Sequence, residues 1–445
     1  MHTLDLRSVK AGDEWVVDIV PRAAVDVSAA VPTATHLIND VRLRGETALI
    51  EQAERLDGVR PARIPVTADE LASALVGLDT GVRDGLELAI DRVRAASIAQ
   101  VPPSASTQFG AGAKVLQRWQ PVSRVGLYIP GGKAVYPSSV VMNVVPAQVA
   151  GVSSIAIASP AQSQFAGSVH PTILGAAALL GVEEVYAMGG AGAIGAFAYG
   201  VPSISLRPVD VITGPGNVYV AAAKRVVRGV VGIDSEAGPT EILVIADAFA
   251  DARLVAHDLV SQAEHDELAA AVLVTDSPEL AEAVAVEVKR IAEAAVHADR
   301  LRASLNGRQS AIVLVRDLAA AAAFSNAYGP EHLEVQTSHP HEMLPLLQNA
   351  GVIFLGSSSP VSLGDYVAGS NHVLPTGGQS RFSSGLGSYT FLRPQQVVSY
   401  DRHALRDVVE HIVALSSAEH LPAHGDAVSA RFTDTDLPAR IPSSL

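Results

Sequence analysis

A glutamate and a histidine stand side by side at positions 331 and 332, in the stretch YGPEHLEVQ. An imidazole exchanges protons near neutral pH, and a neighbouring carboxylate can assist it on the same substrate. Adjacent side chains of a strand point to opposite faces, so Glu331 and His332 can serve one site only at a bend, which Gly329-Pro330 supplies. From these residues alone, a catalytic pair and an ordinary polar loop are equally good interpretations.

A second group of residues has the donors that a divalent metal ion needs. Gln262 and His265, in SQAEHDE, are three positions apart and would share one face of a helix. Oxygen and imidazole donors without thiolate suit a zinc-like ion, but spacing alone leaves a metal site and unrelated residues equally possible. The other candidates are Asp365 and His372 in the glycine-rich GDYVAGSNHVLPT, which predicts a loop, and Glu419, His420 and His424 in EHLPAHGD.

Glycine-rich turns suggest a third kind of chemistry. Gly190-Ala-Gly192-Ala-Ile-Gly195 fits G-x-G-x-x-G, follows an expected strand and opens an expected helix, where backbone N–H groups can receive a pyrophosphate. The next strand carries its acid, Asp210, at its start and not at the end where a ribose would lie. Two more turns, GPGN at 214–217 and PGGK at 130–133, favour a dinucleotide site over a helix-packing turn.

Composition narrows the class of protein. The 445 residues carry a net charge of -14, which argues against a nucleic-acid binder, and no cysteine, which excludes disulfides and cysteine nucleophiles. The N-terminus lacks an apolar signal core, which predicts a cytoplasmic protein. The stretch between Lys133 and Glu183 has no charged residue, but prolines such as Pro146 and Pro160 interrupt it. Buried strands and packed helices are therefore expected there, and no membrane span.

Alternating short apolar strands and helices predict the architecture. Helical spacing occurs in 36–56 and 83–99, and a pair of strands is expected around Pro121. From about 128 to 239, and again from Thr240 to about 386, strands alternate with helices, which is typical of parallel α/β sheets. After about 387 the pattern predicts helix and then a Pro- and Ser-containing tail.

Blocks spread over nearly the whole chain resemble one family, the histidinol dehydrogenases, which are NAD-dependent enzymes that complete histidine biosynthesis. The blocks occur in the family's order, which makes the resemblance far more specific than the glycine motif. They are GLYIPGGKAVYPSS, GGAGAIGAFAYG, TGPGNVYVAAAKR, IDSEAGPTEILVIAD, SQAEHD, YGPEHLE, GDYVAGSNHVLPTGG and EHLPAHGDAV.

The resemblance implies a fold class: α/β, with two incomplete Rossmann-like parallel-sheet domains, a small N-terminal arm and a helical C-terminal segment exchanged in a homodimer. The expected division is an arm over 1–24, an α/β domain over 25–127 and 240–386 that carries metal and catalytic residues, an NAD-binding domain over 128–239, and a C-terminal segment over 387–445 that reaches the partner subunit.

The resemblance also implies site residues. Zn²⁺ would be bound by Gln262, His265, Asp365 and, from the partner subunit, His424. NAD⁺ would contact Tyr128, Asn217 and position 192, where the family has glutamine and this chain has Gly192; we therefore discount the glycine fingerprint and expect altered contacts there. His420 has no family role. The substrate contacts would be Thr240, Gln262, His265, His332, Asp365, His372, Glu419 and His424.

The implied reaction is the NAD-dependent four-electron oxidation of L-histidinol to L-histidine, through L-histidinaldehyde and its hydrate. Because the chain has no cysteine for a thiohemiacetal, the second oxidation must use water. His332 would then be the base for the hydroxyl and Glu331 would activate the water, with the metal positioning the substrate. The alternatives are a related dehydrogenase acting on another amino or hydroxy alcohol and a zinc-dependent hydrolase. No nucleic acid or membrane partner is expected.

Overall fold

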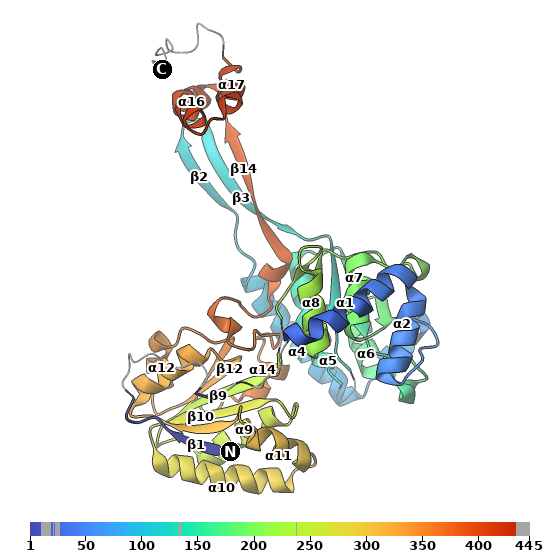
Figure 1. Cartoon of the computed structure of the whole chain (residues 1–445), viewed down its shortest axis with the longest axis vertical. Helices are drawn as coiled ribbons and strands as arrows, with labels where there is room; N and C mark the ends of the chain where they lie inside the picture. Colours follow the sequence, from blue (N-terminus) through green and yellow to red (C-terminus); the bar gives the residue numbers. More distant parts are fainter. Residues whose placement is uncertain (10–18, 21, 23–26, 132–134, 237, 433–445) are drawn as a thin grey trace. The chain divides into compact units, whose positions relative to one another are not determined.

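The chain forms two compact units, which are described separately. The computed structural model describes residues 1–9, 19–20, 22, 27–131, 135–236 and 238–432 (Figure 1). The first unit comprises Met1–Val101 and Val122–Phe391, and the second comprises Pro102–Pro121 and the chain from Leu392 onward. Parts of the predicted N-terminal arm, of the PGGK turn and of the C-terminal tail lie outside the described residues.

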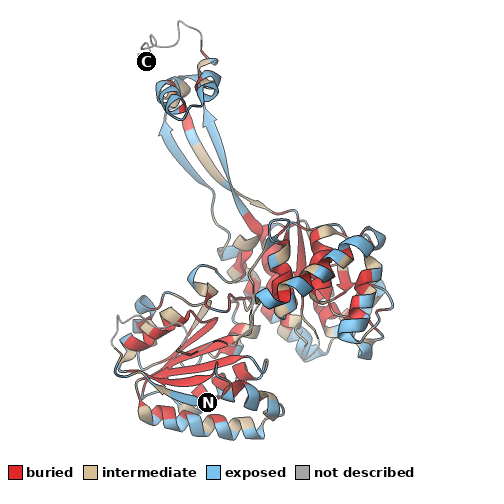
Figure 2. Ribbon diagram, viewed as in Figure 1, coloured by how far each residue is buried: buried red, intermediate tan, exposed pale blue. Residues whose placement is uncertain are grey.

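A six-stranded parallel sheet forms one half of the first unit. Its central strand β9 (Glu241–Ala246) sends Ile242, Val244 and Ala246 to one face and Leu243 and Ile245 to the other, and both faces are buried (Figure 2). Helices cover both faces, which explains why four of its six strands are apolar at nearly every position. The order is β1 (His2–Asp5), β11 (Ala311–Leu314), β10 (Ala270–Thr275), β9, β12 (His332–Gln336) and β13 (Val352–Leu355). The helices are α9 (Ala252–Ala263), α10 (Pro278–Ala294), α11 (Ala298–Asn306), α12 (Leu318–Tyr328), α13 (Pro340–Met343) and α14 (Val361–Tyr366).

A five-stranded parallel sheet forms the other half of the first unit. Gly126 lets a helix approach this sheet closely, because a Cβ at position 126 would lie 2.6 Å from Cγ of Phe197. The order is β6 (Glu184–Ala187), β5 (Ser154–Ser159), β4 (Arg124–Tyr128), β7 (Val211–Thr213) and β8 (Gly232–Ile233). The helices are α1 (Val27–Arg44), α2 (Glu46–Gln52), α3 (Ala68–Val76), α4 (Thr80–Ala99), α5 (Pro137–Ala150), α6 (Pro171–Leu179), α7 (Gly190–Tyr199) and α8 (Val218–Val227).

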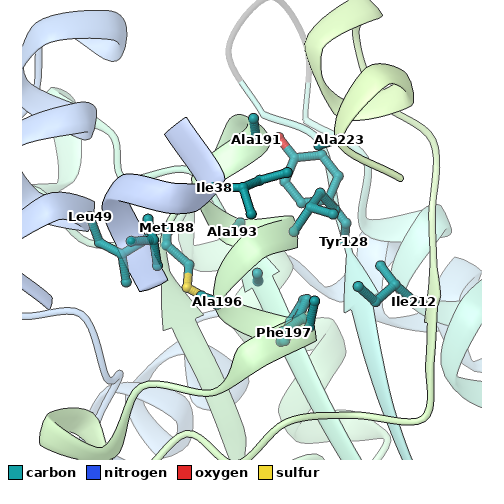
Figure 3. Close-up of a cluster of buried hydrophobic side chains, with 14 of the residues drawn as sticks. Ile38, Leu49, Tyr128, Met188, Ala191, Ala193, Ala196, Phe197, Ile212 and Ala223 are labelled. Atoms are coloured by element: carbon teal, nitrogen blue, oxygen red, sulfur yellow. The ribbon is translucent and has the colours of Figure 1, made fainter. Parts of the chain in front are cut away.

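The helices of residues 27–99 belong with the five-stranded sheet. Ile38 of α1 and Leu49 of α2 lie in one hydrophobic cluster with Phe197 of α7 (Figure 3), while α3 packs on α6 and α4 on α5. This grouping differs from the sequence-based one, which joined residues 25–127 to the six-stranded half. Apolar spacing marked these segments as helices but carried no information about which sheet their apolar faces cover.

The described residues of the second unit form a three-stranded antiparallel sheet and three helices. Strands β2 (Ala105–Gly110), β3 (Ala113–Pro121) and β14 (Leu392–Tyr400) pair in the order β14-β3-β2. Helices α15 (Arg402–Arg406), α16 (Val409–Ala418) and α17 (Pro422–Ser429) follow, and α16 packs on α17. The sequence analysis expected helix after 387 and missed β14. Eight of its nine residues are exposed, so LRPQQVVSY has no alternating apolar face to reveal a strand (Figure 2).

Most other elements confirm the expected α/β class, and the strands of both parallel sheets fall where the pattern put them, apart from the edge strands β1 and β8, which the sequence analysis missed. The uncharged stretch folds over 135–182 into α5, β5 and α6, as buried strand and helix. In the described part of the chain, no helix combines the length and the apolar character needed to cross a bilayer.

Candidate active site

Glu331 and His332 lie at the bend that the sequence predicted. Helix α12 ends at Tyr328, Gly329 follows with a left-handed φ of 59°, and His332 is the first residue of β12. Both side chains are buried, with exposed fractions of 6% and 4%. His332 pairs in register with Ile242, so the pair lies at the amino end of β12, beside Glu241 at the amino end of β9.

The Glu331 carboxyl group is fixed by hydrogen bonds on one oxygen. Its Oε2 accepts from the Thr240 hydroxyl at 2.5 Å and from the Glu241 N–H at 2.9 Å. Burial raises the pKa of Glu331 to about 8, although these two bonds act in the opposite direction. A carboxyl group with such a pKa can take up and release a proton near neutral pH, as a general base or acid must.

The His332 ring is held in one tautomer. Its Nδ1 lies 3.0 Å from the Glu241 carbonyl oxygen, which can only accept, so Nδ1 carries the proton. Burial lowers the pKa of His332, which favours the neutral ring. Its Nε2 is buried without a hydrogen-bond partner among the described residues, and the nearest carboxylate oxygen, Oδ1 of Asp365, is 4.0 Å away. Nε2 therefore offers an unused lone pair for a substrate proton.

Gln262 and His265 present suitable metal donors, though not as expected. Helix α9 ends at Ala263, so the two do not share a helix face; instead the His265 Nδ1 lies 3.2 Å from the Gln262 carbonyl oxygen. That contact leaves the His265 Nε2 as the ligand atom. The Gln262 amide donates to the Thr240 hydroxyl, and its Oε1 is buried without a partner among the described residues. An unpartnered buried oxygen is a good position for a cation.

Asp365 and His372 complete this side of the site. Asp365 lies on the short helix α14, not in the loop that its glycine neighbours predicted. The His372 Nδ1 donates to the Asp365 carbonyl oxygen at 2.9 Å, and its Nε2 accepts from the Ser139 hydroxyl of α5 at 2.9 Å. Burial lowers the pKa of His372, although the Asp365 carboxylate opposes this. His372 is therefore a fixed neutral ring that links the two halves of the first unit.

Glu419 and His424, predicted for the same site, belong to the second unit. Glu419 follows the last residue of α16, and His424 is an exposed residue of α17. In the described portion of the chain, no three His, Asp or Glu side chains lie close enough together to hold an ion. The residues that the first unit brings together are Thr240, Gln262, His265, Glu331, His332, Asp365 and His372.

The residues predicted for the cofactor lie at the carboxyl ends of the five-stranded sheet. Tyr128 ends β4, and its hydroxyl accepts from the Gly190 N–H at 3.2 Å; burial raises its pKa to about 12. Asn217 caps α8, accepting from the N–H groups of Tyr219 at 3.0 Å and Val220 at 3.2 Å. The strand order reverses between β4 and β7, and open α/β sheets bind nucleotides at such a switch point.

Gly192 is buried in α7, and a neighbouring side chain occupies the space in front of it. A Cβ at position 192 would lie 2.5 Å from Oε1 of Gln52 and 3.4 Å from Cδ2 of Leu49. Gln52 is buried, and its Nε2 donates to the Leu37 carbonyl oxygen at 3.1 Å. A glutamine at position 192 therefore requires Gln52 to move.

The sequence analysis missed two residues of this site. Glu241 holds both Glu331 and His332 through its backbone, and Ser139 holds His372. A charged residue opening the otherwise apolar strand EILVIA is a signal that could have marked Glu241. Nothing in the local sequence marks Ser139, because its contact joins residues 233 positions apart.

The two parallel sheets, with a buried carboxyl group and a buried imidazole side by side at one of them, define an α/β protein with a candidate site for proton transfer. The family model for histidinol dehydrogenase matches residues 20–432. The chain is 65% identical to the histidinol dehydrogenase of Leifsonia xyli subsp. xyli over 98% of this chain and all of that one. It is 54% identical to that of Mycolicibacterium smegmatis over 97% of this chain and 98% of that one.

The crystal structure of histidinol dehydrogenase from Elizabethkingia anophelis superposes with a TM-score of 0.89 at 30% identity, covering 97% of this chain and 98% of that one. The chain therefore belongs to the histidinol dehydrogenase family and is an oxidoreductase.

Proposed function

We propose that the chain oxidises L-histidinol to L-histidine in two NAD⁺-dependent steps. The observation that carries this proposal is the buried Nε2 of His332, which has no partner among the described residues and lies next to the Glu331 carboxyl group. A general base poised beside a second proton acceptor suits a reaction in which first an alcohol and then an aldehyde hydrate lose protons.

In the first oxidation, His332 removes the proton of the substrate hydroxyl. Its Nε2 accepts the proton while Nδ1–H stays bonded to the Glu241 carbonyl oxygen. The Asp365 carboxylate at 4.0 Å stabilises the imidazolium that forms. NAD⁺ accepts a hydride in each oxidation, so two NADH form per molecule of histidinol.

In the second oxidation, water supplies the oxygen of the carboxylic acid. Glu331 takes a proton from water as the water adds to the aldehyde carbon, and the protonated His332 gives its proton to the aldehyde oxygen, which yields the gem-diol and leaves His332 neutral. His332 then removes a diol proton as the second hydride leaves. The overall balance is one histidinol, two NAD⁺ and one water giving histidine, two NADH and three protons. Without cysteine, a thioester route is not open to this chain.

The metal donors of the first unit fit Zn²⁺. Gln262 Oε1 and His265 Nε2 would hold the ion together with Asp365, and His424 of the partner subunit would close the set in a homodimer with exchanged C-terminal segments. When bound, the ion supplies a Lewis acid that fixes the substrate's imidazole and amine. Thr240 and His372 would line the substrate, and Glu419 would meet its ammonium group.

Residues 128–239 are proposed to bind NAD⁺ through Tyr128, Asn217 and the turn at Gly192, and residues 240–386 to carry the metal and catalytic side chains. The Asn217 Oδ1 is used in capping, which leaves its Nδ2 as a donor for the cofactor. We place the enzyme in the cytoplasm, acting on a free amino alcohol and without a nucleic-acid partner.

The test is stoichiometry. Zn²⁺-loaded protein is incubated with L-histidinol and excess NAD⁺, and NADH and histidine are quantified. We expect two NADH per histidine, with loss of turnover on chelation and recovery on adding Zn²⁺. Absence of NADH formation with histidinol would rule out the proposed substrate, and one NADH per turnover with aldehyde release would rule out the second step.

A further inference from the structure

Arg22 makes a buried ion pair that the mechanism above does not use. Its Nη1 donates to Oε1 of Glu241, and the two side chains are only 19% and 5% exposed. Burying two charges is costly unless their geometry is good and further hydrogen bonds satisfy the donors. Arg22 meets that condition because its second nitrogen has a partner of its own.

The same guanidinium holds the bend that precedes the catalytic pair. Its Nη2 donates to the Tyr328 carbonyl oxygen and lies 3.4 Å from the Gly329 carbonyl oxygen. Its carbon atom lies 4.0 Å from the centre of the Tyr328 ring, in a cation–π contact. Arg22 thus joins the end of α12 to the first residue of β9.

Glu241 passes this restraint to both catalytic side chains. Its N–H donates to Glu331 at 2.9 Å, and its carbonyl oxygen accepts from Nδ1 of His332 at 3.0 Å. A shift of Glu241, or of the bend, would move one partner of each bond. Such a shift would loosen the Glu331 carboxyl group and release the tautomer of His332.

We propose that Arg22 is a positioning residue for the Glu331–His332 pair. It does not contact the reacting atoms; it fixes Glu241 through the ion pair and the Tyr328–Gly329 bend through hydrogen bonds. The inference rests on the proposed roles of Glu331 and His332. Removing a group that orients a metal ligand typically changes activity by about 10-fold to 100-fold, and we expect an effect of similar size for a group that orients the Glu331–His332 pair.

The test compares Arg22→Gln and Arg22→Lys with Arg124→Gln. Arg124 is the matched control, because its ion pair with Glu184 is also partly buried, at 7% and 38% exposure, but lies at the amino end of β4 in the five-stranded sheet. We measure kcat, the KM values for histidinol, histidinaldehyde and NAD⁺, and the thermal midpoint of each variant.

For Arg22→Gln we expect kcat to fall about 10-fold to 100-fold, with more loss on histidinaldehyde and little change in the KM for NAD⁺. Arg22→Lys should recover part of the lost kcat, because lysine keeps the positive charge. It lacks the second nitrogen that donates to the Tyr328 carbonyl oxygen, so the recovery should be incomplete. Arg124→Gln should lower the thermal midpoint with kcat within about two-fold. Equal kcat for the Arg22→Gln and Arg124→Gln variants would overturn the proposal; if Arg22→Gln does not fold, unchanged kcat in Arg22→Lys would do so.

A second readout does not depend on turnover. In ¹⁵N-histidine-labelled protein without substrate, the ring signals of His332 are assigned by their loss in His332→Ala. We expect the Nδ1–H tautomer in the parent and a tautomer mixture in Arg22→Gln, with the parent pattern kept in Arg124→Gln. An unchanged His332 signal in Arg22→Gln would reject the positioning role. A parent that shows the tautomer but forms no NADH from histidinol would reject the proposed substrate instead.

Discussion

Each parallel sheet of the first unit is built from five consecutive strands in the same order, with the first of the five in the middle. These are β6-β5-β4-β7-β8 in one half and β11-β10-β9-β12-β13 in the other, which also adds β1 at its edge. The candidate cofactor residues lie at the carboxyl ends of the first sheet, at Tyr128 and Asn217, whereas Glu331 and His332 lie at the amino ends of the second. In two sheets of the same topology, the residues proposed for the cofactor and those proposed for catalysis therefore lie at opposite ends of the strands.

The two groups of residues lie at different strand ends because different side chains occupy the two ends of each sheet. At the carboxyl end of β9, Asp247 accepts from the backbone and hydroxyl of Ser338 at 2.7 and 2.9 Å and from the Phe249 N–H at 3.0 Å, which occupies that end with loop contacts. At the carboxyl ends of β6 and β7, α7 and α8 begin after glycine turns, and Asn217 already accepts from the N–H groups of the first turn of α8. The positive ends of these two helix dipoles favour an anionic group there. Strand order alone did not decide where each site formed.

The largest effect is expected from a substitution in the site at the amino end of β12, which holds Glu331 and His332. His332→Ala removes the base of both oxidations, so turnover of histidinol and of histidinaldehyde should each fall about 10³-fold, as loss of general-base catalysis predicts. NADH formation under saturating NAD⁺ measures this. His341→Ala, an exposed histidine in the same half, is the control and should keep full turnover. If His332→Ala kept its activity, a residue other than His332 would have to be the base.

Glu331→Gln should separate the two half-reactions. We expect histidinaldehyde oxidation to fall about 10²-fold and histidinol oxidation only a few-fold, because only the second step needs activated water. Since burial raises the pKa of Glu331 to about 8, the carboxylate form increases as pH rises through that value. The parent's aldehyde oxidation should therefore increase from pH 7 to 9, and the variant's should not. Equal losses in both half-reactions would contradict the separate role of Glu331.

A smaller effect is expected at the carboxyl-end site. Gly192→Gln alone should not improve NAD⁺ binding, because Oε1 of Gln52 lies 2.5 Å from the position of the new Cβ. The pair Gly192→Gln with Gln52→Ala removes the obstruction, and one recovered hydrogen bond of about 1 kcal/mol should lower the Kd for NAD⁺ about five-fold. Calorimetric titration of the single and double variants, with Gln52→Ala as control, measures this. If the double variant bound NAD⁺ no more tightly than Gln52→Ala, a glutamine at position 192 would not contact the cofactor in this protein.

The effect expected to be smallest on activity concerns the stability of the fold next to Glu331 and His332. Burial, and then the adjacent Asp258 carboxylate, raise the pKa of Glu334, while Gln336 donates to both groups at 2.9 Å. The folded chain therefore keeps a proton that the unfolded chain loses above its ordinary pKa, and the free energy of unfolding falls as pH rises, by at most about 1.4 kcal/mol per pH unit.

Glu334→Gln should flatten that slope. Urea unfolding at pH 6 and at pH 8.5 measures it, with Glu293→Gln on the exposed side of α10 as control. An unchanged slope in Glu334→Gln, with turnover intact, would show that the proton resides on Asp258.

Much of the fold could be predicted because both sheets are buried on two faces. Runs such as EILVIA and SIAIAS are apolar apart from their end residues, so their strands are visible without knowledge of neighbours. Strand β14 was missed because its residues are exposed, and Asp365 was placed in a loop because glycines hid the single short helix α14. The prediction of secondary structure failed for these segments because their sequences lack the apolar pattern that a buried strand or helix has.

The sequence by itself determined the chemical repertoire of this protein: a Glu-His pair after a Gly-Pro bend, no cysteine, and glycine turns after apolar strands. It also determined the two α/β series, since periodicity follows from local burial. Only the tertiary structure decided that Glu241 orients both Glu331 and His332, that Ser139 fixes His372, and that Arg22 secures the bend. Those contacts join residues 90 to 306 positions apart, and no local pattern encodes them because each depends on which strands lie side by side.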